Sequence, residues 1–252
     1  MDTVNETNLK HMLKKIPNNA VFTSKKLAEE GVYYDLQRIY ERNGWIKRIE
    51  QGAYVKLDQK YTMDGAIYAL QSQLGLSIHI GGLTALSEKH GKAHNIAFSR
   101  EKKLFGYRNE KLPKWFKNLY GKECRLNLTT FLPKDLGLMD SDNGDFITQI
   151  STPERAIMEM LYCVPNKASL NESYQVMELL VSLKPALIQE LLEKCSSIKV
   201  KRLFLYMAER AGHAWLKRLD LSKINLGNGV REIIKGGTLD KKYNIIVGNI
   251  EE

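Results

Sequence analysis

The sequence predicts an α+β protein in which an N-terminal winged helix-turn-helix domain is followed by a mixed α/β C-terminal domain with a helical bundle. Three observations support this. Near the N-terminus, three short segments at helical spacing precede an alternating segment that reverses at Gly52. The middle of the chain mixes strand-like segments with helices, and residues 151–211 hold successive helices that each carry one apolar stripe. We place the domain boundary at Gly91, which gives domains of residues 1–91 and 92–252.

The first domain begins with three predicted helices. The first has an apolar stripe at i, i+3, i+4 and i+7, formed by Leu9, Met12, Leu13 and Ile16. The second starts at Thr23 or Ser24, either of which can cap a helix. It ends at Gly31, where a tight turn needs a positive φ angle. The third runs from Tyr34 to Asn43. Two short helices joined by a turn that contains glycine are typical of a helix-turn-helix.

The alternating segment after the third helix predicts a β-hairpin. Residues 45–49 can pair with residues 53–57 across a turn in which Gly52 supplies the left-handed conformation. Helix, helix, helix, hairpin is the order of a winged helix. In that fold the third helix can enter the major groove of DNA, and the hairpin can lie along the backbone.

Candidate DNA contacts follow from this arrangement. Four side chains at the start of the third helix would meet base edges: Tyr33, Tyr34, Gln37 and Arg38. Three others would contact phosphates: Arg42, Lys47 and Arg48. In the alternative interpretation the winged helix mediates only protein contacts, and its arginines pair with Asp35 and Glu41. The placement of charge favours DNA.

Composition points to a polyanionic partner and to a cytoplasmic protein. The formal net charge is +9, and residues 89–125 hold eleven Lys or Arg against three Glu. In this basic segment, Trp115, Phe116 and Tyr120 alternate with lysines. They either line a nucleic-acid groove or, as we favour, form core beneath solvated lysines. No apolar run approaches the roughly 18 residues that a membrane span needs. The three cysteines, Cys124, Cys163 and Cys195, are typical of reduced core thiols.

Metal, cofactor and catalytic motifs are not found. His79, His90 and His94 match no standard zinc spacing, so we expect no metal and no cofactor. Gly81-Gly82 before a helix could bind an anion, although a tight strand-to-helix turn explains it more simply. The Gly227–Arg231 loop lacks the ending of a phosphate loop and predicts a hairpin turn. Without any hydrolase, kinase or metalloprotease motif, we expect no enzyme.

The predicted second domain combines strands with capped helices. Its strand-like segments are residues 95–99, 125–131, 145–151, 223–226, 230–234 and 243–248. One helix starts at Thr152 followed by Pro153, or at Ser151 with Glu154 closing a capping box. A second starts at Ser169 and extends its apolar stripe to Leu183. Two more begin at Pro185 and Lys199.

Two long segments then resemble a known family. "LAEEGVYYDLQRIYERNGWIKRIEQGAYVK" and "AIYALQSQLGLSIHIGGLTALSEKHGKAH" are similar to the N-terminal domain of AbiEi-type antitoxins, the transcriptional-regulator halves of type IV toxin–antitoxin (abortive-infection) systems. The match is carried by Gly44-Trp45, Gly52-Ala53-Tyr54, His79-Ile80-Gly81-Gly82 and Thr84-Ala85-Leu86. It continues through "ISTPERAIMEMLYCVP" and "INLGNGVREIIKGG".

The resemblance implies a regulator with two activities. Its winged helix would bind inverted repeats in double-stranded DNA upstream of its own operon and repress it. Its C-terminal part would counteract a cognate toxin of the nucleotidyltransferase-like class, without necessarily forming a stable complex with it. The resemblance supplies no catalytic residue. The residues themselves leave open a winged-helix module that serves protein interaction or nucleic-acid processing instead.

Overall fold

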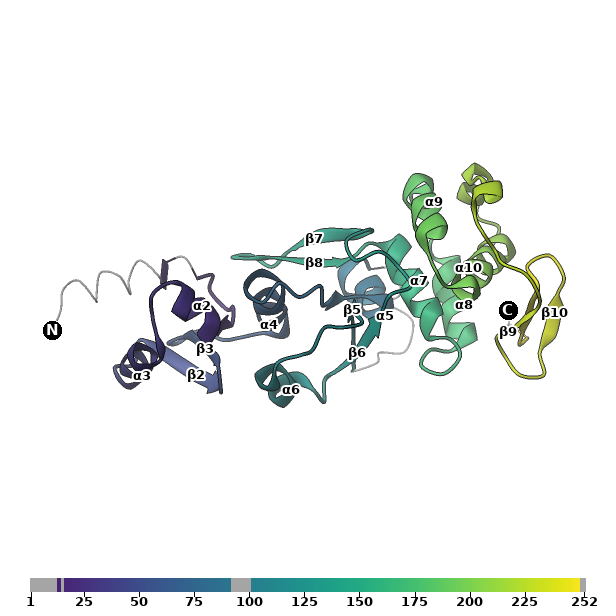
Figure 1. The fold of residues 1–252 in the computed structure, drawn as a ribbon. Coiled ribbons are helices and arrows are strands. Elements are labelled where there is room, and N and C mark those ends of the chain that lie inside the picture. The colour runs from purple at the N-terminus through teal and green to yellow at the C-terminus, as the bar shows by residue number, and fades with distance from the viewer. Residues whose placement is uncertain (1–12, 15, 92–100, 250–252) are drawn as a thin grey trace. The chain divides into compact units, whose positions relative to one another are not determined.

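The computed structural model describes residues 13–14, 16–91 and 101–249 (Figure 1). Its chain packs into two compact units, and each unit collects several separate segments. Unit 1 comprises Met1–His79, Asn109–Arg125 and Asp140–Gln149. Unit 2 comprises Ile80–Arg108, Leu126–Met139 and Ile150–Glu252. We expected one boundary at Gly91, whereas these packing units alternate along the chain. That residues 1–91 and 92–252 can act separately stays a prediction.

The winged helix in unit 1 forms as predicted. Its two helices are α2 (Ser24–Glu29) and α3 (Tyr34–Arg42). The hydroxyl of Thr23 caps α2 by accepting a hydrogen bond from the Lys26 amide (3.1 Å), and Gly31 takes a φ of 84° in the turn. The predicted first helix lies mostly outside the described residues.

The wing is a hairpin that acquires a third strand. Strands β2 (Ile46–Glu50) and β3 (Ala53–Lys56) pair antiparallel around Gly52, as predicted. The third strand, β1 (Phe22–Thr23), was not predicted, and it pairs with the other edge of β3. The core beneath the wing consists of Ile16, Phe22, Leu27, Val32, Tyr40, Ile46 and Tyr54.

A helical layer completes unit 1. Helix α4 (Met63–Tyr68) runs directly into a π-helix, Ala69–Gln73. The Gln73 side chain links this helix to the wing, because its oxygen accepts from the Thr23 amide (2.8 Å) and its nitrogen donates to the Val21 carbonyl (3.0 Å). Helix α6 (Lys114–Tyr120) belongs to the same unit. Its aromatic side chains are buried, which confirms that they form core.

The chain crosses from one unit to the other at strands of a five-stranded sheet. Its strands are β4 (His79–Ile80), β5 (Lys102–Tyr107), β6 (Cys124–Thr129), β7 (Leu138–Asp142) and β8 (Ile147–Ser151). They are ordered β6-β5-β4-β8-β7, and β4 is parallel to β8 with Ile80 opposite Ile150. The predicted strand at residues 95–99 lies outside the described residues.

Unit 2 contains the predicted helical bundle. Helix α5 (Gly82–Thr84) continues as a π-helix, Ala85–Lys89. The longer helices are α7 (Pro153–Cys163), α8 (Leu170–Glu178), α9 (Pro185–Lys194) and α10 (Ile198–Arg210). Helix α7 is central, since it contacts α5, α8, α9 and α10. Thr152 and Ser169 cap α7 and α8 as predicted. The apolar stripe predicted to extend to Leu183 stops earlier, because α8 ends at Glu178 and Leu179 is exposed.

The C-terminal end of unit 2 is a small sheet fastened to α10. Its strands are β9 (Arg231–Glu232), β10 (Thr238–Asp240) and β11 (Ile245–Val247), in the order β10-β11-β9. The predicted strand at residues 223–226 is wrong, because a 3₁₀ turn, Leu221–Lys223, occupies its start. Beyond that turn, backbone carbonyls point at α10 and accept hydrogen bonds from Lys201 and Arg202 instead of pairing in a sheet.

Candidate nucleic-acid interface

The outward face of the helix-turn-helix carries most of the predicted base-contacting residues. Tyr33 is 70% exposed and Tyr34 is 62% exposed, at the N-terminal end of α3. One turn later the Arg38 guanidinium lies over the Tyr34 ring, 6.0 Å from its centroid. An aromatic ring that supports an exposed guanidinium limits its rotamers and leaves its hydrogen-bond donors facing outward.

Gln37 differs from its neighbours because its side chain points into the protein and is 2% exposed. Its nitrogen donates to the carbonyls of Val32 (2.8 Å) and Ser24 (3.2 Å), and its oxygen accepts from the Ser24 hydroxyl (2.6 Å). An amide held this way has no donor left for a base. We therefore withdraw Gln37 from the base-contacting set: it fastens α3 to α2. Its position three residues before the buried Tyr40 was the signal in the sequence.

The predicted phosphate contacts form an exposed basic rim. Arg42, Lys47 and Arg48 are all exposed. An open depression between α3 and β2 brings Arg38, Arg42 and Arg48 together. Its other lining residues are Asp35, Ile39 and Glu41. Arg38 and Arg42 of α3 thus share one surface with Arg48 of the wing, whereas Lys47 does not line this depression.

These cations are not neutralised by the acidic side chains near them. Within the described residues, no carboxylate lies within ion-pair distance of Arg38, Arg42, Lys47 or Arg48. On α2, in contrast, Lys26 pairs with Glu30 at 2.9 Å. The pairing with Asp35 and Glu41 that the protein-contact interpretation requires does not form here. Arg48 Nε donates to the backbone carbonyl of Glu50 (3.4 Å). A guanidinium without a carboxylate partner keeps donors for phosphate or base acceptors.

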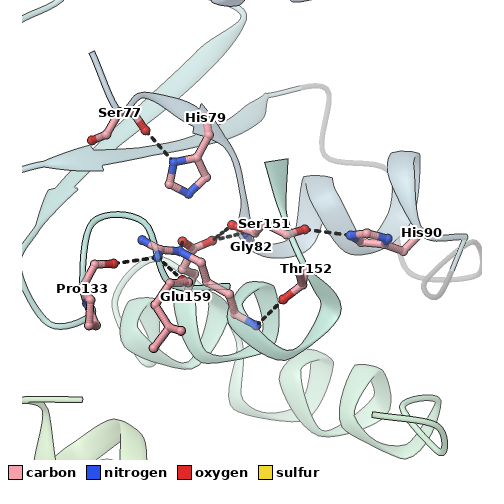
Figure 2. Close-up of polar contacts among 10 residues, drawn as sticks. Ser77, His79, Gly82, His90, Pro133, Ser151, Thr152 and Glu159 are labelled. Carbon is pink, nitrogen blue, oxygen red and sulfur yellow. Dashed lines mark hydrogen bonds and ion pairs between the residues drawn. The ribbon is translucent and has the colours of Figure 1, made fainter. Parts of the chain in front are cut away.

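The Gly81-Gly82 turn in unit 2 binds an anion, and that anion is one of the protein's own carboxylates. The Gly82 amide donates to Glu159 Oε2 (3.0 Å), and the Ser151 hydroxyl donates to the same oxygen (2.7 Å) (Figure 2). A Cβ at Gly81 would lie 2.1 Å from that oxygen, so only glycine fits. Arg155 Nε holds the other oxygen at 2.8 Å. Both oxygens of the Glu159 carboxylate therefore have hydrogen-bond partners within the protein, so this cluster stabilises the fold and is not an open anion site.

The histidines also have ordinary partners. His90 Nε2 lies 2.7 Å from the Ser151 carbonyl, and His79 Nδ1 lies 2.7 Å from the Ser77 carbonyl (Figure 2). His94 lies outside the described residues. Among the residues with described positions, no three His, Cys, Asp or Glu side chains gather as metal ligands. In the same part of the chain, no helix has the length and apolar character to cross a bilayer.

A helix-turn-helix packed with a three-stranded sheet that includes the wing hairpin defines a winged-helix protein. Comparison with protein families identifies the family to which the chain belongs. Residues 100–248 match the model described as a transcriptional regulator, the AbiEi antitoxin of type IV toxin–antitoxin systems, and residues 5–98 match the model of the AbiEi antitoxin N-terminal domain. The chain belongs to this family of antitoxins and transcriptional regulators, as the resemblance implied.

A solved structure has a similar fold. It is the crystal structure of the Rv2827c protein from Mycobacterium tuberculosis, with a TM-score of 0.57 and 13% sequence identity. The match covers 97% of this chain and 91% of that chain, and at this identity it supports the fold alone. None of the curated proteins matches this sequence.

Proposed function

We propose that this protein represses its own operon by binding inverted repeats in the promoter and counteracts a nucleotidyltransferase-like toxin. The observation that carries the DNA-binding half is the exposed set of arginines on α3 and β2, which form no ion pair with any carboxylate of the described residues. Membership of a regulator family supports the same assignment. The proposal requires no catalytic step, and it places the protein in the cytoplasm, where its DNA is.

In the proposed complex the N-terminal end of α3 enters the major groove. Tyr33, Tyr34 and Arg38 meet base edges there, with Arg38 suited to a bidentate contact with guanine. Arg42, Lys47 and Arg48 bind phosphates on either side of the groove. Two protomers occupy the two half-sites of an inverted repeat, and the free protein is a monomer that pairs on DNA.

A gel-shift titration with the protein's own upstream DNA tests the first half. A shuffled duplex of the same length and composition is the competitor. Specific binding of winged-helix regulators exceeds non-specific binding by roughly 10³-fold or more at physiological salt. Equal affinity for the two duplexes would contradict the proposal. It would favour the protein-interaction alternative, in which the exposed Tyr33 and Tyr34 are partner contacts.

Growth on co-expression with the neighbouring toxin gene tests the second half. The full-length chain should restore growth, and a version with Arg38→Ala and Arg42→Ala should still do so, because these residues serve DNA. If that double variant is folded yet gives no protection, the winged helix itself takes part in toxin neutralisation.

A further inference from the structure

The most basic part of unit 1 outside the winged helix is the segment Asn109–Arg125, which contains α6. It holds five Lys or Arg against two Glu. One of these acids, Glu110, is engaged within the unit, since it accepts hydrogen bonds from the Ser77 amide (2.8 Å) and hydroxyl (3.0 Å). The proposed DNA contacts described above do not use this segment.

Helix α6 has two chemically distinct faces. Trp115, Phe116 and Tyr120 point inward and pack against one another, with the Phe116 and Tyr120 rings 5.4 Å apart. Burial raises the pKa of the Tyr120 hydroxyl. Lys114 and Lys117, one helical turn apart, are exposed on the other face. The aromatic side therefore fixes the direction in which the lysines project.

The lysine face is extended at both ends and is not neutralised. The further exposed cations of the segment are Lys111, Lys122 and Arg125. Across the described part of the chain, none of the five forms an ion pair with a carboxylate. A solvated face is the ordinary explanation of such a run, but solvated faces commonly alternate their charges, and the α6 face itself carries no acid.

Position separates α6 from an ordinary solvated helix. It packs against β2, the strand that carries Lys47 and Arg48, and α3 packs against the same strand. The three elements that carry these exposed cations, α3, β2 and α6, thus pack next to one another. In the same unit, Phe146 lies between β7 and β8 and packs onto Tyr68 of α4 (5.2 Å), and Asp142 and Asp145 beside it are exposed.

We infer that α6 is a second DNA-contacting element, which binds backbone phosphates of the duplex beyond the wing. This inference rests on the proposed function, since it extends the same DNA footprint. Lys114 and Lys117 stand about 5–6 Å apart at Cβ, a spacing that lets two flexible ammonium groups reach neighbouring phosphates. Phosphate contacts carry no sequence information, so α6 contributes affinity and footprint length but no base preference.

The test is a double variant, Lys114→Gln with Lys117→Gln. It removes two phosphate contacts, so it should weaken binding to promoter and shuffled DNA alike, by about tenfold near physiological salt. The slope of log K against log salt should become smaller by about two, at roughly 0.9 per phosphate. The matched control is Lys217→Gln with Lys241→Gln, two exposed lysines of unit 2 that give the same change in net charge.

Shortening the duplex provides an independent measurement. Removing base pairs step by step from the flank beyond the wing should weaken the wild-type protein at a length where the α6 variant is already insensitive. If the α6 variant keeps wild-type affinity and salt slope while Arg38→Ala still loses promoter preference, the inference is overturned and the proposed function stands. If the wild-type protein does not distinguish promoter from shuffled DNA, the proposed function fails instead.

Discussion

The arginines of the winged helix and two buried arginines of unit 2 are in opposite environments. Arg38, Arg42 and Arg48 face water, and in the described residues none pairs with a carboxylate. Arg202 is 1% exposed and donates to four carbonyls, those of Leu226, Gly227, Gly229 and Asn244, at 2.6–2.9 Å. Arg155, also buried, spans Glu159 and the carbonyls of Pro133 and Leu136.

Desolvation explains why the buried and the exposed arginines have different partners. A buried guanidinium has lost its water, so the protein must supply an acceptor for nearly every N–H, and the resulting network holds loops in place. An exposed guanidinium keeps its water and can exchange it for a phosphate or a base edge. The number of arginines therefore says little about DNA binding. The exposed arginines that form no ion pair with a carboxylate mark the candidate DNA-binding surface.

The largest effect should follow from Arg202→Met. This change keeps the apolar stem but removes the guanidinium donors of the Leu226, Gly227 and Gly229 carbonyls, whereas the Asn244 carbonyl keeps the Arg231 amide. Unfolding should therefore become easier by about 3–5 kcal/mol. Urea unfolding followed by circular dichroism measures the loss. The exposed Arg218→Met serves as control and should stay within about 0.5 kcal/mol of wild type. A loss below 1 kcal/mol for Arg202→Met would show that water can replace the guanidinium.

Arg38→Ala should have the opposite effect to Arg202→Met: it should weaken DNA binding and leave stability nearly unchanged. Binding to promoter DNA should weaken by about 1–3 kcal/mol, with relaxed preference at one base position, while stability changes little. Binding to a set of duplexes with single base changes measures it. The same loss on every duplex would reassign Arg38 to a phosphate contact.

Gln37→Leu tests whether the buried Gln37 of α3 stabilises the fold and does not contact DNA. Losing hydrogen bonds to Ser24 and Val32 should destabilise the protein by about 1–2 kcal/mol. Base preference should remain as in wild type, because the side chain does not reach the surface. A changed preference in a folded variant would return Gln37 to the base-contacting set.

Lys47→Ala and Arg48→Ala should give the smallest effects. Each should lower the slope of log K against log salt by about one and weaken binding to all sequences similarly. Stability should not change, since both side chains are exposed. Salt titrations of the two single variants, beside Lys217→Ala, provide the measurement. An unchanged slope in both would remove the wing from the footprint.

Much of the local structure could be predicted because its signals are local. The cap at Thr23, the turn at Gly52 and the proline at the start of α9 act through neighbouring backbone groups. The predictions were wrong or incomplete where residues distant in the sequence determine the local structure. The segment after Leu221 is not a strand because Lys201 and Arg202 take its carbonyls. β1 is too short to show a period and exists only because β3 offers it an edge.

By itself, the sequence determined the order of helices and hairpin, the inward aromatics of α6 and the exposed cations of α3, because spacing along a chain fixes which residues share a face. Only the tertiary structure decided that Gln37 turns inward, that Glu159 fills the Gly81-Gly82 turn, and that α6 lies beside the wing. Each of these depends on residues that meet across a fold, and pairing over such distances leaves no periodic signal.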